Sequence, residues 1–428
     1  MTFIFTGFMV LLFSIGIPVA FSLGITGLVA FIAEQGTRIN LAIMTQRMMY
    51  GINNFVLLAI PLFILAAKLM NTAGITKRLF DFANHLVGYL PGGLGHANVV
   101  ASLIFSGMSG SAVSDAAGLG TIEMKAMLDA GYDRDFSAAI TASSSTIGPI
   151  FPPSIPFVIF GVASGVSVGK LFLGGVIPGV LMALALMVMI TIYAHRKGYP
   201  RMESFSLRMI GRSFKGAFLP LLTPVILLGG IWTGYFTPTE ASAVAVAYAI
   251  ILGLFVYREI SLRELGAIFV NTMKETAALG FIICAGSFYG WLLMRSGIPI
   301  RFAETIAGVS QNPYMILFLI SLFLLVVGCF IETVVAILIL TPIFVPIIDK
   351  VGIDPVHFGL IMVLNLMIGL LTPPFGVVLF VLVKVANIPF GRLVRATLPF
   401  LIPLLAVLFL ITVFPPLVTM LPNLLMPK

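Results

Sequence analysis

The sequence has little charge for its length. Of its 428 residues, 9% are charged and 60% are hydrophobic, whereas a soluble domain carries about 25% charged residues. The mean hydropathy is +1.14. A chain with so few charges cannot cover a water-facing surface, which excludes soluble enzymes, nucleic-acid-binding proteins and secreted disulfide scaffolds. The composition predicts an integral membrane protein that has the lipid bilayer around it and no nucleic-acid partner.

Cysteine and recognisable catalytic motifs are also scarce. The two cysteines, Cys284 and Cys329, lie in apolar runs and are typical of small core residues. The four histidines show no metal-ligand spacing, and the chain has no G-x-S-x-G, Walker or C-x-x-C motif. We therefore expect neither catalysis nor a transition-metal site. Without an ATP-binding loop, any pumping has to use an ion gradient, although a channel remains an alternative.

Long apolar runs are abundant, for example LALMVMITIYA and FLISLFLLVVGCFI. They are continuous, so they predict helices and not the alternating strands of a barrel. At about 20 residues per crossing the chain has room for roughly ten to twelve crossings. The first 21 residues lack a basic start and a small-residue cleavage site, so we expect a first membrane helix there.

One segment, residues 195–215, is far more basic than the rest. It carries six cations against one acid, Glu203: Arg196, Lys197, Arg201, Arg208, Arg212 and Lys215. The positive-inside rule places it in the cytoplasm. We therefore predict a first membrane repeat at 1–194, a basic cytoplasmic linker at 195–215 and a second membrane repeat at 216–428.

The two halves share uncommon residues at a constant offset of 221 positions. The pairs are Gly107 with Gly328, Gly131 and Asp133 with Gly352 and Asp354, Gly148 with Gly369, Pro152 and Pro153 with Pro373 and Pro374, and Pro178 with Pro399. This register predicts an internal duplication. If each half crosses the membrane an odd number of times the second copy is inverted, as in many secondary transporters. A parallel repeat remains the alternative.

Each half contains a helix that prolines must interrupt. These segments are SAAITASSSTIGPIFPPSIPFVIFG (137–161) and NLMIGLLTPPFGVVLF (365–380). Broken backbone at membrane depth is tolerated where it is buried in protein or lines a wet cavity. It exposes carbonyls that suit a hard cation and helix N-termini that suit an anion. The alternative is a pair of structural proline kinks.

A second polar interruption precedes each break, at 105–120 and at 327–336. Small polar residues within an apolar run predict a re-entrant hairpin, with a small-residue packing face as the alternative. Asp115 and Glu332 lie near the two tips, and each could take a charge role. Asp115 could neutralise a nearby cation or cap a half-helix, whereas Glu332 stands where the first copy has a small residue, so the two sites would differ electrostatically. Glu240 is expected at a helix start. Lys68, Lys384, Arg295 and Arg301 are expected at the membrane interface, and one of them could attract an anionic substrate.

Four stretches resemble the large membrane subunit, called DctM-like, of the tripartite ATP-independent periplasmic (TRAP) transporters. They are SGMSGSAVSDAAGLGTIEM (106–124), SSSTIGPIFPPSIPFVIFG (143–161), ETVVAILILTPIFVPI (332–347) and GIDPVHFGLIMVLNLMIGLLTPPFGVVLFV (352–381). The resemblance implies an all-α polytopic membrane protein of the bacterial inner membrane. It also implies two inverted repeats, each with a re-entrant helical hairpin and a discontinuous helix, and an elevator mechanism driven by sodium symport.

The resemblance also implies partners and cargo. A periplasmic binding protein would deliver an organic acid anion, and a separate small four-helix membrane subunit would brace the permease. Sialic acid and C4-dicarboxylates are family substrates, and overall similarity favours sialic acid. A standalone sodium-coupled carboxylate carrier is the alternative.

By position, the resemblance assigns two sodium sites and no transition metal. The first comprises Ser106, Gly107, Ser109, Ser145, Thr146 and Gly148, and the second comprises Gly328, Thr333, Met367, Gly369 and Thr372. Sodium takes oxygen ligands, which hydroxyls and freed carbonyls supply. The substrate is expected between the two sites, near Pro152, Pro153, Pro373 and Pro374.

Overall fold

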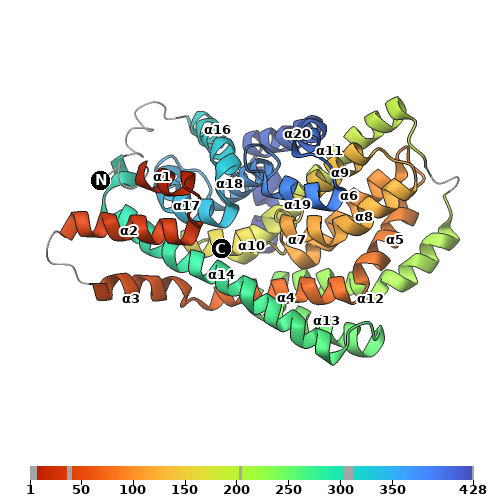
Figure 1. Cartoon of the computed structure of the whole chain (residues 1–428), viewed down its shortest axis with the longest axis horizontal. Coiled ribbons are helices and arrows are strands. Elements are labelled where there is room, and N and C mark those ends of the chain that lie inside the picture. The colour runs from red at the N-terminus through yellow and green to blue at the C-terminus, as the bar shows by residue number, and fades with distance from the viewer. Residues whose placement is uncertain (1–6, 36–40, 202–204, 302–311, 427–428) are drawn as a thin grey trace.

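The computed structural model describes residues 7–35, 41–201, 205–301 and 312–426, and in this part of the chain the regular structure is entirely helical (Figure 1). The helices up to the basic segment are α1 (Met9–Ser14), α2 (Val19–Gln35), α3 (Leu41–Ile52), η2 (Phe55–Leu58), α4 (Ala59–Thr72), α5 (Ile75–Val87), α6 (Gly93–Ser109), α7 (Ala112–Ala117), α8 (Leu119–Asp129), α9 (Arg134–Ser145), α10 (Ile155–Ser164) and α11 (Val168–Lys197). The remaining helices are α12 (Leu207–Trp232), α13 (Pro238–Ile251), η3 (Leu252–Val256), α14 (Leu262–Arg295), α16 (Pro313–Phe330), α17 (Thr333–Lys350), α18 (Pro355–Gly369), α19 (Val377–Ala386), α20 (Phe390–Val413) and α21 (Pro416–Leu425).

Eight helices of the described part are long and apolar enough to cross a membrane. Five more apolar helices are too short to qualify, and the two arms of the 365–380 break, α18 and α19, are among them. The number of crossings therefore stays a prediction, and the predicted breaks appear as half-length helices beside the long ones. Both ends of the predicted linker at 195–215 are helical, because α11 continues to Lys197 and α12 begins at Leu207.

The predicted interruptions are all present. The chain leaves the helix between α9 and α10 and again between α18 and α19, and both gaps contain the double proline. It also breaks at Gly110 between α6 and α7, and at Ile331 between α16 and α17. At each of these four places the helix stops in a segment rich in proline or small polar residues, as the sequence predicted.

Helix boundaries follow the same offset of 221 residues. α6, α9 and α10 correspond to α16, α18 and α19, with starts that agree within one residue of the offset. Counterpart helices also contact counterpart elements of the other half. The helix α10 contacts α17 as its counterpart α19 contacts α7, and α9 contacts α20 as its counterpart α18 contacts α11. Such exchange between equivalent pieces is what a two-fold relation between halves produces. It supports the duplication, while the inverted orientation stays a prediction.

The interrupted segments lie in the middle of the molecule. In Figure 1, α3, α4, α12, α13 and α14 follow the lower side and α16, α18, α20 and α11 the upper side, with α7, α10 and α19 between them. The long helix α14 packs against α2, α3 and α4. At its start Ser261 and Glu264 form a reciprocal capping box. Thr237 and Glu240 do the same for α13, which confirms the expected role of Glu240.

Candidate functional site

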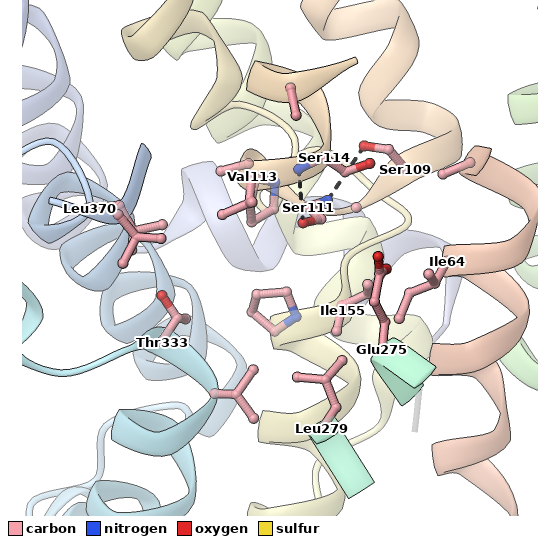
Figure 2. Close-up of a pocket in the computed structure, with 18 of the residues that line it drawn as sticks. Ile64, Ser109, Ser111, Val113, Ser114, Ile155, Glu275, Leu279, Thr333 and Leu370 are labelled. Carbon is pink, nitrogen blue, oxygen red and sulfur yellow. Dashed lines mark hydrogen bonds between the residues drawn. The ribbon is translucent and has the colours of Figure 1, made fainter. Parts of the chain in front are cut away.

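A cavity of about 650 Å³ opens between the two halves, where the interruptions meet (Figure 2). Its walls come from α4, α14, the tip of the first hairpin, the start of α10 and the tip of the second hairpin. Figure 2 shows Ser109, Ser111 and Ser114 at the top of the cavity. Thr333 and Leu370 lie on the left of the view, opposite Ile64 and Glu275 on the right. The remaining polar lining comes from Lys68, Asn71 and Glu332. This volume suits a small organic molecule.

The first hairpin turns at Gly110, which has a φ of +62°. A Cβ at this position would lie 2.7 Å from the carbonyl oxygen of Pro153, so only glycine fits against the broken helix. The backbone N–H of Ile155 donates to the carbonyl of Gly110 at 3.3 Å and joins the tip to α10. Ser111 then caps α7 by accepting from the N–H of Ser114. The predicted hairpin tip and the predicted break are therefore in direct contact.

Asp115 lies behind this tip, with 2% of its surface exposed. The hydroxyl of Ser109 donates to its Oδ1, and within the described residues its Oδ2 has no hydrogen-bond partner. That Oδ2 lies against Gly148, where a Cβ would overlap it. A buried carboxylate oxygen without a donor is costly unless a cation or proton satisfies it. Asp115, Ser109 and Gly148 thus form a small acceptor-lined site of the kind that a hard cation occupies.

The other residues predicted for the first sodium site are buried in the same region. Their hydroxyls donate back into their own helices: Ser106 to Leu103, Ser145 to Ala142 and Thr146 to Ser143. A donating hydroxyl still has lone pairs for a cation. The Cα of Gly107 faces Pro224 of α12, so its hydrogens serve helix packing and only its carbonyl is available as a ligand.

The second interruption is built around a backbone crossing. The Cα atoms of Gly328 and Gly369 face one another, and a Cβ on Gly369 would overlap the carbonyl carbon of Gly328. The N–H of Phe375 donates to the carbonyl of Cys329 at 3.2 Å, which joins the second tip to the second break. The structure therefore brings Gly328 and Gly369 together as predicted, through backbone contact.

Glu332 caps α17. Its Oε2 accepts from the N–H groups of Val334 and Val335 at 2.9 and 3.3 Å, a capping role that the sequence reasoning did not predict. Thr333 and Met367 line the cavity, and in the described part of the chain the hydroxyl of Thr333 has no hydrogen-bond partner. The hydroxyl of Thr372 donates to the carbonyl of Ile368 at 2.9 Å.

The four prolines expected near the substrate lie beside the cavity and not in its lining. Both peptide bonds, Pro152–Pro153 and Pro373–Pro374, are cis. The first pair is buried and the second is exposed. The prolines that do line the cavity are Pro149 and Pro156, one on each side of the buried pair.

Residues 5–417 match the family model of the tripartite ATP-independent periplasmic transporter, DctM component. The chain is 49% identical to the sialic acid TRAP transporter large permease protein SiaM of Vibrio cholerae, over 98% of this chain and 97% of that protein. It is 43% identical to the C4-dicarboxylate large permease protein DctM of Pseudomonas aeruginosa, over 86% and 87% of the two chains. The crystal structure of the YdaH transporter of Alcanivorax borkumensis shares the fold, with a TM-score of 0.62 at 15% identity over 87% of each chain.

The chain belongs to the DctM family of TRAP transporters. It is a transport protein and not an enzyme, and it crosses the bacterial inner membrane several times, in agreement with the eight candidate spans in the described residues. The family, the membrane location and the helical fold expected from the sequence are confirmed.

The permease also has two polar features that sequence reasoning did not predict. Lys68 of α4, one of the four cations that could attract an anionic substrate, lines the cavity, and its Nζ lies 2.7 Å from Oε1 of Glu275 on α14. Glu123 of α8 is 1% exposed, and within the described residues its Oε1 has no hydrogen-bond partner. The segment LGTIEMKAMLD gave no signal that Glu123 is buried, because its surroundings come from other helices.

This TRAP permease therefore holds two kinds of polar group at one place. Hydroxyls, the Lys68–Glu275 ion pair and the helix cap Glu332 line the cavity, whereas Asp115 lies just behind the wall that Ser109 forms. The lining can bind the polar groups of a substrate, and the buried acid can balance a cation close to it.

Proposed function

We propose that the chain is the large permease subunit of a sodium-coupled TRAP transporter that imports an organic acid anion by an elevator mechanism. The observation that carries the proposal is the cavity itself, which both hairpin tips line and which has the Asp115–Ser109 pair directly behind it. A site built from both halves at the point where their helices break is the arrangement of ion-coupled secondary transporters.

Sialic acid is the substrate we favour. The 49% identical relative carries the name of a sialic acid permease, and a sialic acid TRAP transporter permease protein of Haemophilus influenzae is 44% identical over 96% of this chain. C4-dicarboxylates are the second candidate, from the 43% identical Pseudomonas aeruginosa relative. The cavity offers Lys68 for a carboxylate, and hydroxyls at Ser109, Ser111 and Ser114 for other polar groups.

The cargo ion fits the first interruption. Sodium prefers oxygen ligands, and the orphaned Oδ2 of Asp115 beside Gly148 and Ser109 offers a negative oxygen with no competing donor in the described residues. The ion would hold the hairpin tip against the broken helix and so favour the geometry that lines the cavity. The resulting unit would then move substrate and sodium together across the membrane.

The test is uptake into proteoliposomes. The permease would be reconstituted with its small four-helix membrane subunit, and a periplasmic binding protein loaded with labelled sialic acid or succinate would be added outside. We expect uptake only with an inward sodium gradient, with the binding protein and with the matching substrate. Uptake by the permease alone from free substrate would support a standalone carrier, and uptake unaffected by sodium would refute the coupling.

A further inference from the structure

A second cavity, of about 330 Å³, lies away from the transport cavity, between α9, α11 and α20. Figure 1 shows these three helices together on the upper side of the molecule. The lining residues are Asp133, Arg134, Asp135, Phe136, Tyr193, Lys197, Tyr199, Arg392, Ala396 and Phe400. It shares no residue with the cavity between the hairpin tips. Its volume is within the range of about 300 to 1,000 Å³ that is typical of small-molecule sites.

Aromatic rings form the floor of this cavity. Phe136 contacts Tyr199, Tyr193 and Phe400, with ring centroids 4.6, 5.6 and 5.9 Å away. Tyr132 stacks on Tyr199 at 4.7 Å, and its hydroxyl donates to the carbonyl of Pro200 at 2.8 Å. Burial raises the pKa of Tyr132 to about 12, so this hydroxyl stays a donor at neutral pH. The floor is therefore apolar and held in place from several helices.

Charged groups surround the mouth. Arg392 donates to Oδ2 of Asp135 at 2.8 Å through Nη2, and Nζ of Lys197 lies 3.3 Å from Oδ2 of Asp133. Arg134 is exposed and forms no ion pair with any described residue. The lining therefore has three cations, Arg134, Lys197 and Arg392, against two acids, Asp133 and Asp135, and this balance favours an anionic ligand.

Two of the cations at the mouth are exposed and can also contact a bound ligand. The side chains of Lys197 and Arg392 are 57% and 61% exposed, so they can turn toward a ligand without breaking a packed core. Arg392 uses Nε and Nη2 for Asp135, and a guanidinium has five N–H donors in all. Donors therefore remain for a phosphate while the contact with Asp135 is kept.

One acceptor inside the cavity needs a donor. The Oδ1 atom of Asp135 is buried and has no hydrogen-bond partner among the described residues, although Oδ2 accepts twice from Arg392. A ligand that satisfies the whole site therefore needs an anionic group for Arg134 and Arg392, and a hydroxyl for Asp135. Its remaining part would lie against apolar rings.

The position of the cavity indicates where such a ligand comes from. Lys197 is the last residue of a 30-residue apolar helix, and Arg392 is in the first turn of another membrane helix. Cations and tyrosines at the ends of membrane helices lie at the level of the lipid headgroups. Basic pockets between membrane helices at this level are suited to anionic lipid headgroups.

We propose that this cavity is a binding site for an anionic phospholipid whose headgroup carries hydroxyls, such as phosphatidylglycerol. The phosphate lies against Arg134 and Arg392, a glycerol hydroxyl donates to Asp135, and the glycerol backbone rests on Phe136 and Phe400. Since α9 and α11 come from the first half and α20 from the second, the lipid joins the two halves at this end.

The test uses the purified full chain in neutral detergent. Phosphatidylglycerol or phosphatidylethanolamine is added, and lipid retained by the protein is counted by native mass spectrometry. We expect at least fivefold more phosphatidylglycerol than phosphatidylethanolamine on the wild type. Arg134→Gln should lower phosphatidylglycerol retention about threefold, and Arg134→Gln with Arg392→Gln about tenfold. Arg263→Gln, an exposed cation at the start of α14, is the matched control and should leave retention unchanged.

Three outcomes would overturn the proposal. Equal retention of the two lipids would contradict an anionic headgroup site, and equal retention by the wild type and both Arg134 variants would place the lipid elsewhere. Displacement of the lipid by millimolar glycerol 1-phosphate would point to a soluble phosphate ligand. Because Arg134 is exposed and has no ion pair, Arg134→Gln alone keeps the test decisive if the double variant fails to fold.

Discussion

The two interruptions follow the same backbone route but differ in their side chains. The first is buried except for the partly exposed Phe151, its Pro152 and Pro153 included, and it has Asp115 beside it. The second is open, with Phe375 55% exposed, and its acid, Glu332, is already engaged as a helix cap. The acid of the first therefore keeps an oxygen without a partner among the described residues, whereas the acid of the second is engaged with the backbone of α17.

The aligned glycines show the same divergence. Gly328 and Gly369 of the second half face each other across a backbone crossing, but Gly107 faces Pro224 and Gly148 faces Asp115 in the first half. The glycine at the second break, Gly369, thus permits close backbone packing, whereas its counterpart at the first break, Gly148, makes room for an acid. A repeat preserves where the chain turns, and the side chains around each turn determine what it binds.

The largest expected effect comes from Asp115→Asn. Loss of the buried charge should raise the sodium concentration needed for half-maximal uptake about 10- to 100-fold, because interactions with a charged group contribute about 1.5 to 3 kcal/mol. Sodium titration of uptake in proteoliposomes measures this shift. Glu332→Gln is the matched variant in the second half and should change sodium dependence less than threefold. Similar shifts in both variants would remove the distinction between the two sites.

Alanine at the aligned glycines should separate folding from ion binding. In Gly369→Ala the new Cβ overlaps the backbone of Gly328, so we expect a loss of about 1 to 3 kcal/mol of stability from overpacking. In Gly148→Ala the overlap is with the end of the Asp115 side chain, which can move, so sodium dependence should weaken more than stability. Thermal unfolding and sodium titration of each variant test this.

Gly280→Ala is the control for both glycine variants. Its Cβ would have no neighbouring atom within 4 Å, and alanine is favoured over glycine in a helix by about 0.8 to 1 kcal/mol. Its unfolding temperature should be unchanged or higher. Equal destabilisation in Gly369→Ala and Gly280→Ala would mean that the crossing is not tightly packed.

Much of the fold could be predicted because proline, glycine and small polar residues act on the backbone locally. The double prolines predicted both broken helices, and the offset of 221 residues predicted equivalent helix boundaries. The number of full crossings was not predictable in the same way. Half-length helices such as α18 and α19 are stabilised by packing on other segments, which local composition does not reveal.

The site was predicted less completely. Ser109, Gly148 and Asp115 come together, and so do Gly328 and Gly369. The ion pair of Lys68 was not predicted, because its partner Glu275 lies more than 200 residues away on another helix. The capping role of Glu332 was not predicted either, because capping depends on the direction of the chain at Ile331. Long-range contacts of this kind leave no local signal.

The two tips should also respond differently to the loss of their caps. Glu332→Ala removes two acceptor contacts, at 2.9 and 3.3 Å, from the start of α17, and should lower stability by about 1 kcal/mol. Ser111→Ala removes a single contact at 3.4 Å from α7, so it should lower stability by only a few tenths of a kcal/mol. Thermal unfolding of the two variants in the same detergent gives the comparison, and a larger loss for Ser111→Ala would contradict it.

The smallest effect is expected at the aligned aspartates that precede α9 and α18. Asp354 caps α18 through contacts at 2.8 and 3.0 Å, whereas Asp133 makes no cap contact and accepts from the hydroxyl of Tyr199 at 2.9 Å instead. This hydroxyl and the nearby Lys197 lower the pKa of Asp133. Because the folded-state pKa is lowered, the stabilisation is present above the unfolded pKa of about 3.9 and is lost as the pH falls through the folded value.

Asp133→Asn should therefore lower stability at pH 7 by only a few tenths of a kcal/mol, since the side chain is 53% exposed and screened by solvent. The difference from the wild type should shrink as the pH falls below the unfolded pKa of about 3.9 and vanish once the pH is below the folded-state pKa. Asp354→Asn is the control, because asparagine caps a helix about as well as aspartate and no charged partner is lost. A pH-independent deficit in Asp133→Asn would show that Tyr199 holds this turn by geometry and not by charge.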